Sequence, residues 1–212
     1  MFCKVGVRIL ILSVLAFILL YSVTSAFHSM VSQVAAATRS TNSFSNLSEK
    51  ILNNKAAALN NLGKYNESLL YSAKVLAIDP NNVDALSSKG VALDHLGNFT
   101  GAIEYYDKAL VIDPKYVPAL NNKGVVLRGL GNFTGAIEYY DKALAIQSND
   151  TYALTNKGTA LDHLGNFTGA IEYYDKALAI NPKYKAALDN KSLLEQYLGG
   201  LKNERAKYLK NI

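Results

Sequence analysis

Two acid–histidine pairs, Asp94-His95 and Asp162-His163, are the residues most suggestive of catalysis. A carboxylate that orients an imidazole is a common way to build a general base. Both pairs lie in helical sequence, however, where adjacent side chains point about 100° apart and do not face each other. The pairs also stand two periods of a thirty-four-residue repeat apart, too far for a shared metal ion. We therefore expect no catalytic residue, no metal site, no cofactor and no enzymatic activity.

One line of polar residues is better suited to binding than to chemistry. It recurs every thirty-four residues and consists of Asn54, Ser88, Asn122, Asn156 and Asn190. Side-chain amides both donate and accept hydrogen bonds, so a row of them can hold the backbone of an extended peptide without reading its side chains. We predict that these residues bind a peptide. The alternative is a hydrated polar stripe.

The period of thirty-four runs through most of the chain. The stretch GNFTGAIEYYDKAL occurs at residues 97–110, 131–144 and 165–178. The dipeptide Leu-Gly follows the same period at Leu62-Gly63, Leu96-Gly97, Leu130-Gly131, Leu164-Gly165 and Leu198-Gly199. A lysine does so at Lys55, Lys89, Lys123, Lys157 and Lys191. Such repetition is typical of units that stack on copies of themselves, because one unit cannot bury its apolar face alone.

Each unit has the apolar spacing of two helices. From Ala102 onward the second unit places apolar residues at i, i+3, i+4 and i+7, which is the pattern of an amphipathic helix. Gly97 is placed to end the preceding helix in the left-handed conformation. Thr100 is placed to cap the following one. Pro114 breaks the chain before the next unit, so we expect a helix, a short turn and an antiparallel helix.

These units resemble the tetratricopeptide repeat. The small residue of the first helix is Gly90, Gly124 and Gly158. The packing alanine is Ala102, Ala136 and Ala170, and the aromatic residue that follows is Tyr106, Tyr140 and Tyr174. The closing proline is Pro80, Pro114 and Pro182. The early tryptophan of the family is replaced by leucine, and the leucine before the small residue by lysine, whose stem can lie along apolar surface.

The resemblance implies an all-α fold, a right-handed superhelical solenoid of antiparallel helix hairpins with about 4.5 units. The residues before it separately predict an N-terminal membrane helix or signal peptide. Gly90 and Ala102 would let two helices approach closely, and Phe99 and Tyr106 would fill the gaps between them. The first helix of each hairpin would line the concave side, where a protein or peptide partner binds.

The expected organisation follows the period. A signal peptide or anchor at residues 1–28 is followed by a flexible linker at residues 29–48. Four repeats then span residues 49–82, 83–116, 117–150 and 151–184. The C-terminal capping helices of a degenerate fifth repeat occupy residues 185–212. Leu201 and Tyr208 keep the register of a second helix in the last unit, while Glu204 and Lys207 make its surroundings polar. A capping unit of a solenoid needs such a polar outer face.

The asparagine line resembles the ladder in the repeat superhelix of the O-linked N-acetylglucosamine transferase, where such residues hold peptide backbones. Ser88 interrupts it, and the chain has no transferase domain. Other family members clamp C-terminal carboxylates of chaperones with basic residues. The corresponding lines here read Asn53, Ser87, Asn121, Thr155 and Ala57, Val91, Val125, Thr159. They contain no basic residue, which argues against a chaperone tail as the partner.

The N-terminus carries a targeting signal. Lys4 and Arg8 precede an uncharged run over residues 9–27, nineteen residues long and close to the length that spans a bilayer. Small residues end the run, so cleavage after Ala26 would give a secreted protein. Without cleavage the two basic residues would hold the N-terminus in the cytoplasm, giving a single-pass membrane protein. In both cases the repeats lie outside the cytoplasm.

The charge distribution argues against nucleic acid as a partner. Residues 1–48 carry three basic residues and no acidic residue. Residues 49–182 carry twelve basic and fourteen acidic residues, and residues 183–212 carry seven basic and three acidic residues, which gives the net charge of +5. A nucleic-acid-binding surface needs a basic stripe along its main face. The repeats are nearly neutral, and the surplus lies at the two ends.

Seven sequons for N-glycosylation occur in the chain. Three are copies within the repeated stretch, and we predict their asparagines, Asn98, Asn132 and Asn166, as glycosylation sites. The alternative is that the threonine of each sequon serves only as a helix cap. The remaining sequons begin at Asn46, Asn66, Asn149 and Asn190.

The sequence thus predicts a membrane-tethered or exported repeat scaffold that binds a protein or peptide in its concave groove. One alternative is an accessory or assembly factor for a protein or polysaccharide complex of the membrane or cell envelope. A second alternative is an accessory subunit of an enzyme.

Overall fold

The computed structural model describes residues 29–33 and 45–210. The predicted membrane segment and most of the predicted linker lie outside these residues. The chain divides into two units, residues 1–51 and 52–212. In the first unit, residues 29–33 and 45–51 are helical, and in the second unit residues 52–61 are helical. Within the described ranges no helix is both long and apolar enough to cross a membrane.

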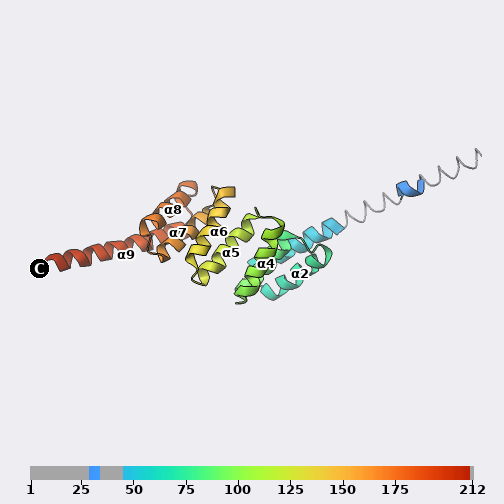
Figure 1. The fold of residues 1–212 in the computed structure, drawn as a ribbon, viewed down its shortest axis with the longest axis horizontal. Coiled ribbons are helices and arrows are strands. Elements are labelled where there is room, and N and C mark those ends of the chain that lie inside the picture. The colour runs from blue at the N-terminus through green and yellow to red at the C-terminus, as the bar shows by residue number, and fades with distance from the viewer. Residues whose placement is uncertain (1–28, 34–44, 211–212) are drawn as a thin grey trace, which may run out of the picture. The chain divides into compact units, whose positions relative to one another are not determined.

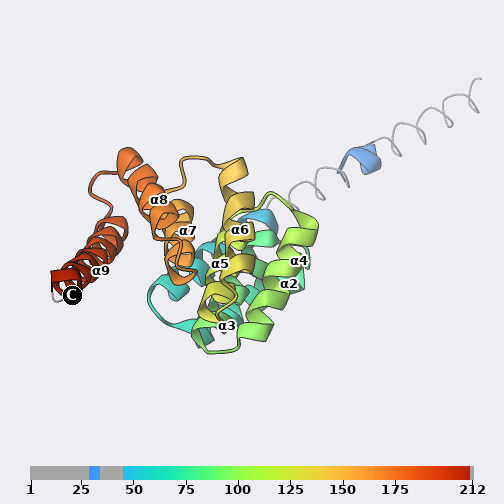
Figure 2. The same ribbon diagram turned by 60° about the vertical axis from the view of Figure 1, so that its left-hand side comes forward.

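The second unit is built from consecutive antiparallel helix hairpins (Figures 1 and 2). After the helix that ends at residue 61 come α2 (Tyr65–Ile78), α3 (Val83–His95), α4 (Phe99–Ile112), α5 (Val117–Gly129), α6 (Phe133–Ile146), α7 (Thr151–His163), α8 (Phe167–Ile180) and α9 (Lys185–Lys210). All regular structure in the described part of the chain is helical. The all-α solenoid expected from the repeats is confirmed.

The turn inside each hairpin depends on a glycine. Gly63, Gly97, Gly131 and Gly165 have φ between 72° and 81°, the left-handed region that favours glycine. The expected cap at Thr100 is wrong. Asn98 caps α4 instead, because its side chain accepts a hydrogen bond from the Gly101 amide at 3.0 Å, and Thr100 lies inside the first helical turn.

The helices of a hairpin approach closely where the sequence repeats a glycine and a tyrosine. A Cβ added to Gly90 would lie 2.5 Å from Cε1 of Tyr106, and the same holds for Gly124 and Tyr140. Tyr106 and Ala102 are fully buried, as predicted.

Phe99 was expected to fill a gap but is 42% exposed. In the next repeat Gly129 stands where the second and fourth repeats have His95 and His163, which stack on the rings equivalent to Phe99.

The first helices form the inner layer of the stack. α3 contacts α5, α5 contacts α7 and α7 contacts α9, whereas no comparable contact joins the described second helices α2, α4, α6 and α8 to one another. Elements on the inside of a curve come closer together than those on the outside. The first helices therefore line the concave face, as the family resemblance implied.

The lysine that replaces the family's leucine links successive hairpins. Lys123 is only 7% exposed, and its ammonium pairs with Asp107 of α4 while lying 4.5 Å from the ring centroid of Tyr139 in α6. Burial alone would lower the pKa of Lys123, but the neighbouring carboxylate and tyrosine raise it above its usual value. The charge is thus retained and compensated. Lys157 repeats the arrangement one hairpin later, with Asp141 and Tyr173.

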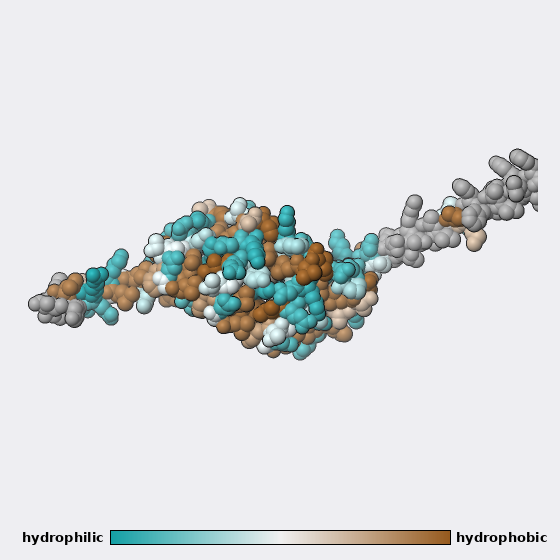
Figure 3. Space-filling model, in the orientation of Figure 1, coloured by the Kyte–Doolittle hydropathy of each residue, from teal (hydrophilic) through white to brown (hydrophobic). Residues whose placement is uncertain are grey.

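The face seen in Figure 3 interleaves hydrophobic and hydrophilic residues along the repeats.

The end of the stack differs from the expected pair of capping helices. α9 is a single helix that continues through Gly199, which does not adopt a positive φ. Leu193 and Tyr197 are therefore 70% and 55% exposed, with no second helix folded against them in the described residues.

Candidate functional site: the concave groove

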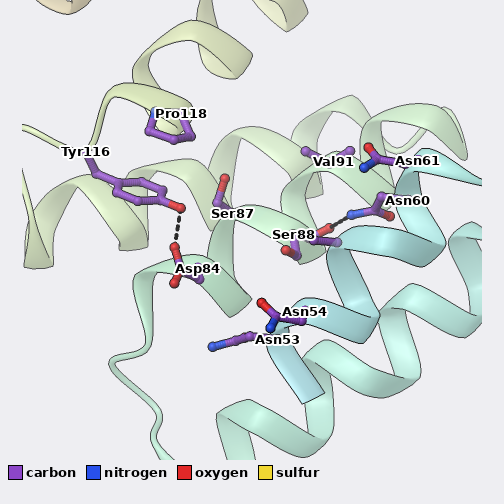
Figure 4. A pocket seen from close by; sticks show the side chains of 11 residues that line it. Asn53, Asn54, Asn60, Asn61, Asp84, Ser87, Ser88, Val91, Tyr116 and Pro118 are labelled. Atoms are coloured by element: carbon purple, nitrogen blue, oxygen red, sulfur yellow. Dashed lines mark hydrogen bonds between the residues drawn. The ribbon is translucent and has the colours of Figure 1, made fainter. Parts of the chain in front are cut away.

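The concave groove, meaning the surface lined by the first helices, contains a pocket of about 360 Å³ near the start of the stack. Three consecutive first helices contribute to it (Figure 4). Most of its lining side chains end in an amide or a hydroxyl: Asn53, Asn54, Asn60, Asn61, Ser87, Ser88 and Tyr116. Asp84 supplies the one carboxylate of the lining, and Ala57, Val91 and Pro118 supply apolar surface.

Part of the pocket's hydrogen-bonding capacity is used internally. Asn60 donates its amide to the backbone carbonyl of Ser88 at 2.8 Å, and the hydroxyl of Tyr116 donates to Asp84 at 2.5 Å (Figure 4). Burial and the Asp84 carboxylate raise the pKa of Tyr116, so its hydroxyl stays protonated at neutral pH. Within the described residues the side chains of Asn54 and Asn61 form no hydrogen bond, which leaves them available to a ligand.

A neighbouring line of amides has a structural role. Asn53 donates to Oδ1 of Asn82 at 3.0 Å, and Asn121 donates to Oδ2 of Asp150 at 2.6 Å. Asn82 and Asp150 are themselves the N-caps of α3 and α7. These two amides therefore link a first helix to the start of the next one, at Asn82 and at Asp150, and their nitrogens are already used.

The five residues predicted to bind a peptide do not form one uniform row. The pocket brings Asn54 and Ser88 together. Asn122 lies half-buried on α5 and forms no hydrogen bond in the described structure. Asn156 lies beside the hydroxyl of Tyr152, and Asn190 donates to Oγ1 of Thr159 at 3.1 Å. The start and centre of the line are open, and its last two members already have partners.

A polar cluster at the centre of the groove was missed by the sequence reasoning. Asp94, Arg128 and Tyr152 come from three consecutive first helices and surround the buried hydroxyls of Tyr106 and Tyr140. Within the part of the chain that the structure describes, the two tyrosine hydroxyls and the buried Nε of Arg128 form no hydrogen bond. The available signal was a change of charge: the residue at this point of the repeat changes from Asp94 to Arg128, whereas the buried tyrosine of α4, α6 and α8 is copied unchanged.

Burial dominates the electrostatics of this cluster. It raises the pKa of Asp94, with a partial opposing effect from His95. It also raises the pKa of Tyr140 to about 12, against the opposing effect of Arg128. The pKa of Tyr152 is raised by burial as well. The tyrosines are thus neutral donors and acceptors at physiological pH, which suits hydrogen bonding to a peptide better than proton transfer.

The two histidines of the acid–histidine pairs serve packing. The ring of His95 stacks on Tyr65 at 4.4 Å between centroids, and that of His163 stacks on Phe133 at 4.7 Å. Each imidazole faces an aromatic ring of the preceding hairpin. Among the described residues no group of three or more His, Cys, Asp and Glu side chains is arranged to hold a metal ion.

Comparison with known proteins finds a family with this repeat architecture. Family models described as tetratricopeptide repeat match residues 50–78, 83–116, 117–150 and 151–184. No curated protein sequence matches the chain.

Three solved structures represent the similar folds. A crystal structure of MamA is 28% identical, covers 73% of this chain and 90% of its own, and superimposes with a TM-score of 0.59. Pseudomonas aeruginosa PilF is 20% identical over 77% of this chain and 75% of its own, with a TM-score of 0.69. The first repeat domain of Spaghetti (RPAP3), solved with the HSP90 peptide SRMEEVD, is 24% identical over 57% of this chain and 96% of its own, with a TM-score of 0.54.

The matched segments cover more than half of the chain, and the helix hairpins seen here are the unit that those models describe. The chain therefore belongs to the tetratricopeptide repeat family, whose scaffold fold is typical of protein–protein interaction.

Proposed function

We propose that this protein is a membrane-tethered or exported scaffold that holds an extended segment of a partner protein in its concave groove. The observation that carries the proposal is the pocket of about 360 Å³ lined by amides and hydroxyls from three successive first helices. Its open side chains, Asn54 and Asn61, each offer a donor and an acceptor. An extended backbone offers the complementary groups at regular spacing.

The centre of the groove adds a second element of recognition. Arg128 is the one basic residue in the cluster with Asp94 and Tyr152, and it offers a charged donor. Hydrogen bonds to charged groups are stronger than those between neutral groups. We infer that Asn122 and the amides of the pocket hold the partner's backbone, while Arg128 donates a hydrogen bond to an acceptor group of the partner.

The tether rests on the sequence alone. Lys4, Arg8 and the uncharged run over residues 9–27 support an anchor or a cleaved signal, with the repeats outside the cytoplasm. Addition of protease to intact cells tests this arrangement. Cleavage of the repeats while a cytoplasmic control protein survives supports export. Survival of the repeats alongside cleavage of a known external protein contradicts it.

The binding function is tested with the double variant Asn54→Ala and Asn122→Ala, which removes the two open amides of the predicted line. The partner is first isolated by co-purification with the full chain from membranes, and its affinity for both forms is then measured. Each net hydrogen bond is worth about 0.5 to 1.5 kcal/mol, so losing two should weaken binding about 5-fold to 150-fold. The melting curve should hardly change, because replacing an exposed or half-buried helical Asn by Ala slightly favours the helix.

Asn149→Ala provides the matched control, because Asn149 is exposed in the turn before α7 and lies outside the groove. It should leave the affinity unchanged. Full binding by the double variant would show that the amides do not hold the partner. Unfolding of the double variant would instead show that these amides belong to the core.

A further inference from the structure

The three copied turns carry a feature that folding does not explain. Each reads Asn-Phe-Thr-Gly, and each opens a second helix, at Asn98, Asn132 and Asn166. The first turn of a helix favours acidic residues because they interact with the helix dipole. α2, which lacks this motif, has Glu67 in its first turn, whereas α4, α6 and α8 have no acidic residue there.

The threonine of each turn has no structural role. Thr100, Thr134 and Thr168 are exposed, and no hydrogen bond within the described residues involves their hydroxyls. Capping is performed by the asparagine three positions before the glycine, so the threonine is not needed as a cap. Threonine is also a weaker helix former than glutamate, the acidic residue that α2 has in its first turn. Duplication accounts for the three identical copies, but not for the residue that was copied.

The asparagine side chain has a free and accessible nitrogen. Oδ1 of Asn98 accepts from the Gly101 amide at 3.0 Å, and Oδ1 of Asn132 accepts from the Gly135 amide at 2.9 Å. The Nδ2 atoms donate no hydrogen bond in the described structure, and these side chains are exposed. A substituent on Nδ2 would leave Oδ1 unchanged, so the cap would be retained.

The glycine keeps the space beside that nitrogen open. A Cβ at residue 101 would lie 2.9 Å from Nδ2 of Asn98, and one at residue 135 would lie 2.7 Å from Nδ2 of Asn132. Glycine is among the least favourable residues inside a helix, so its presence in the first turn calls for a reason. A Cβ at residue 101 would also lie 3.0 Å from Cγ and Oδ1 of Asn98, so the glycine makes room for the whole capping side chain, its amide nitrogen included.

We propose that Asn98, Asn132 and Asn166 carry N-linked glycans, one per repeat on the edge formed by the turns. The proposal rests on the export stated in the proposed function, because the sugar donor must meet the chain outside the cytoplasm. In the transfer, a bond forms between C1 of the first sugar and Nδ2 of asparagine, and the bond from C1 to the phosphate of a lipid-linked glycan breaks. The lipid phosphate leaves, and the amide gives up one proton to solvent.

The structure separates these sequons from others in the chain. Asn190 lies within α9 and its Nδ2 is already engaged with Thr159. The sequon at Asn66 ends in Ser68, which is fully buried and donates to the carbonyl of Ala56 at 2.9 Å, so core packing explains that serine. None of the three proposed asparagines lines the pocket of the groove. Glycans at the turns are therefore compatible with a partner in that pocket.

The test uses the full chain isolated from its native membranes. Trypsin releases the three sites in different peptides, residues 90–108, 129–142 and 158–176, which mass spectrometry distinguishes. We expect sugar mass on all three, with fragment ions that place it on asparagine. The triple variant Thr100→Ala, Thr134→Ala and Thr168→Ala should lose this mass and keep its fold. The matched Thr-to-Ser triple should retain the mass, because serine preserves the sequon.

Intact cells that make the protein are also labelled with a membrane-impermeant amine reagent, which reports whether the repeats lie outside. This distinguishes a failure of the glycosylation proposal from a failure of export. If the repeats are labelled and the three peptides are unmodified, the glycosylation proposal is wrong and export stands. If the repeats are neither labelled nor modified, the export on which the proposal rests is wrong and the proposal fails with it. Undiminished sugar mass in the alanine variant would also overturn the proposal.

Discussion

Two glycines on one helix allow the close packing of the hairpins to be tested directly. Gly124 and Gly129 both lie on α5, but in different surroundings. A Cβ added at Gly124 would lie 2.5 Å from Cε1 and 2.9 Å from Cζ of Tyr140, whereas a Cβ at Gly129 would meet no atom within 4 Å. Tyr140 is fully buried, so its ring cannot swing out into solvent. We predict opposite effects on stability for the two changes to alanine.

The magnitudes follow from two opposing contributions. Forcing an extra methyl group into a packed core destabilises by about 1 to 3 kcal/mol. Replacing glycine by alanine in a helix stabilises by about 0.5 to 1 kcal/mol. Gly124→Ala should therefore lower the free energy of unfolding by up to about 2.5 kcal/mol, which corresponds to a fall in Tm of up to about 10 °C. Gly129→Ala should raise the free energy of unfolding by about 0.5 to 1 kcal/mol.

Thermal unfolding followed by circular dichroism, on both variants and the parent protein under identical conditions, measures the difference. The comparison within one helix cancels any general effect of glycine replacement in α5. If Gly124→Ala melts at or above Gly129→Ala, the ring of Tyr140 does not require a small residue opposite it. The account of how the hairpins pack would then be refuted.

Three further predictions concern charge and the end of the stack. Lys157→Met should lower the free energy of unfolding by only about 1 kcal/mol in urea titrations, since its partner Asp141 stays half-exposed and solvated. Asp94→Asn should be more stable than the parent at pH 7, because burial raises the pKa of Asp94 and thus disfavours its charged form. The folded protein binds the Asp94 proton more tightly than the unfolded chain, so the parent gains stability as pH falls through the raised pKa. Urea titrations at several pH values should therefore show that the stability advantage of the Asn variant shrinks as pH falls. Deletion of residues 185–212 should expose the apolar surface that packs on Leu194 and promote aggregation, which light scattering would detect.

The repeat period predicted the fold because the same packing constraint acts in every hairpin. The glycine opposite a buried tyrosine and the left-handed glycine in each turn are local requirements, and each leaves a mark in the sequence. The cap was assigned to Thr100 instead of Asn98 because both residue types cap helices and the two candidates stand two positions apart. The end of the stack was misjudged for another reason: Gly199 permits a turn but does not impose one.

The groove was harder to predict than the core. The asparagine line was found from its period, but whether an amide is open depends on residues one repeat away, such as Thr159 for Asn190. Such hydrogen bonds leave no periodic signal. The cluster around Arg128 was missed for the opposite reason, because it differs from its counterparts in the neighbouring repeats and a search for repetition passes over it.

The third repeat departs from its neighbours at two adjacent positions, of which the first, Arg128, belongs to the cluster in the groove. Where the second and fourth repeats have Asp-His, it has Arg128-Gly129. His95 and His163 each stack on an aromatic ring of the preceding hairpin, so Gly129 leaves the equivalent ring of Phe99 without a partner and 42% exposed. The neighbouring repeats show that the fold accepts Asp-His at this point. The change to Arg-Gly therefore loses the stacking on Phe99 and gains nothing for the fold. We infer that Arg128 was kept for binding.

The double variant Arg128→Asp and Gly129→His would make the third repeat match the second and fourth. It should fold at least as stably as the parent, because a histidine at 129 has room to stack on Phe99. Loss of a charged hydrogen bond, worth about 1.5 to 3 kcal/mol, should weaken partner binding about 10-fold to 150-fold. Gly129→His alone is the control and should gain stability while keeping the affinity. Unchanged affinity in the double variant would show that Arg128 does not contact the partner, and the centre of the groove would then be a product of repeat divergence.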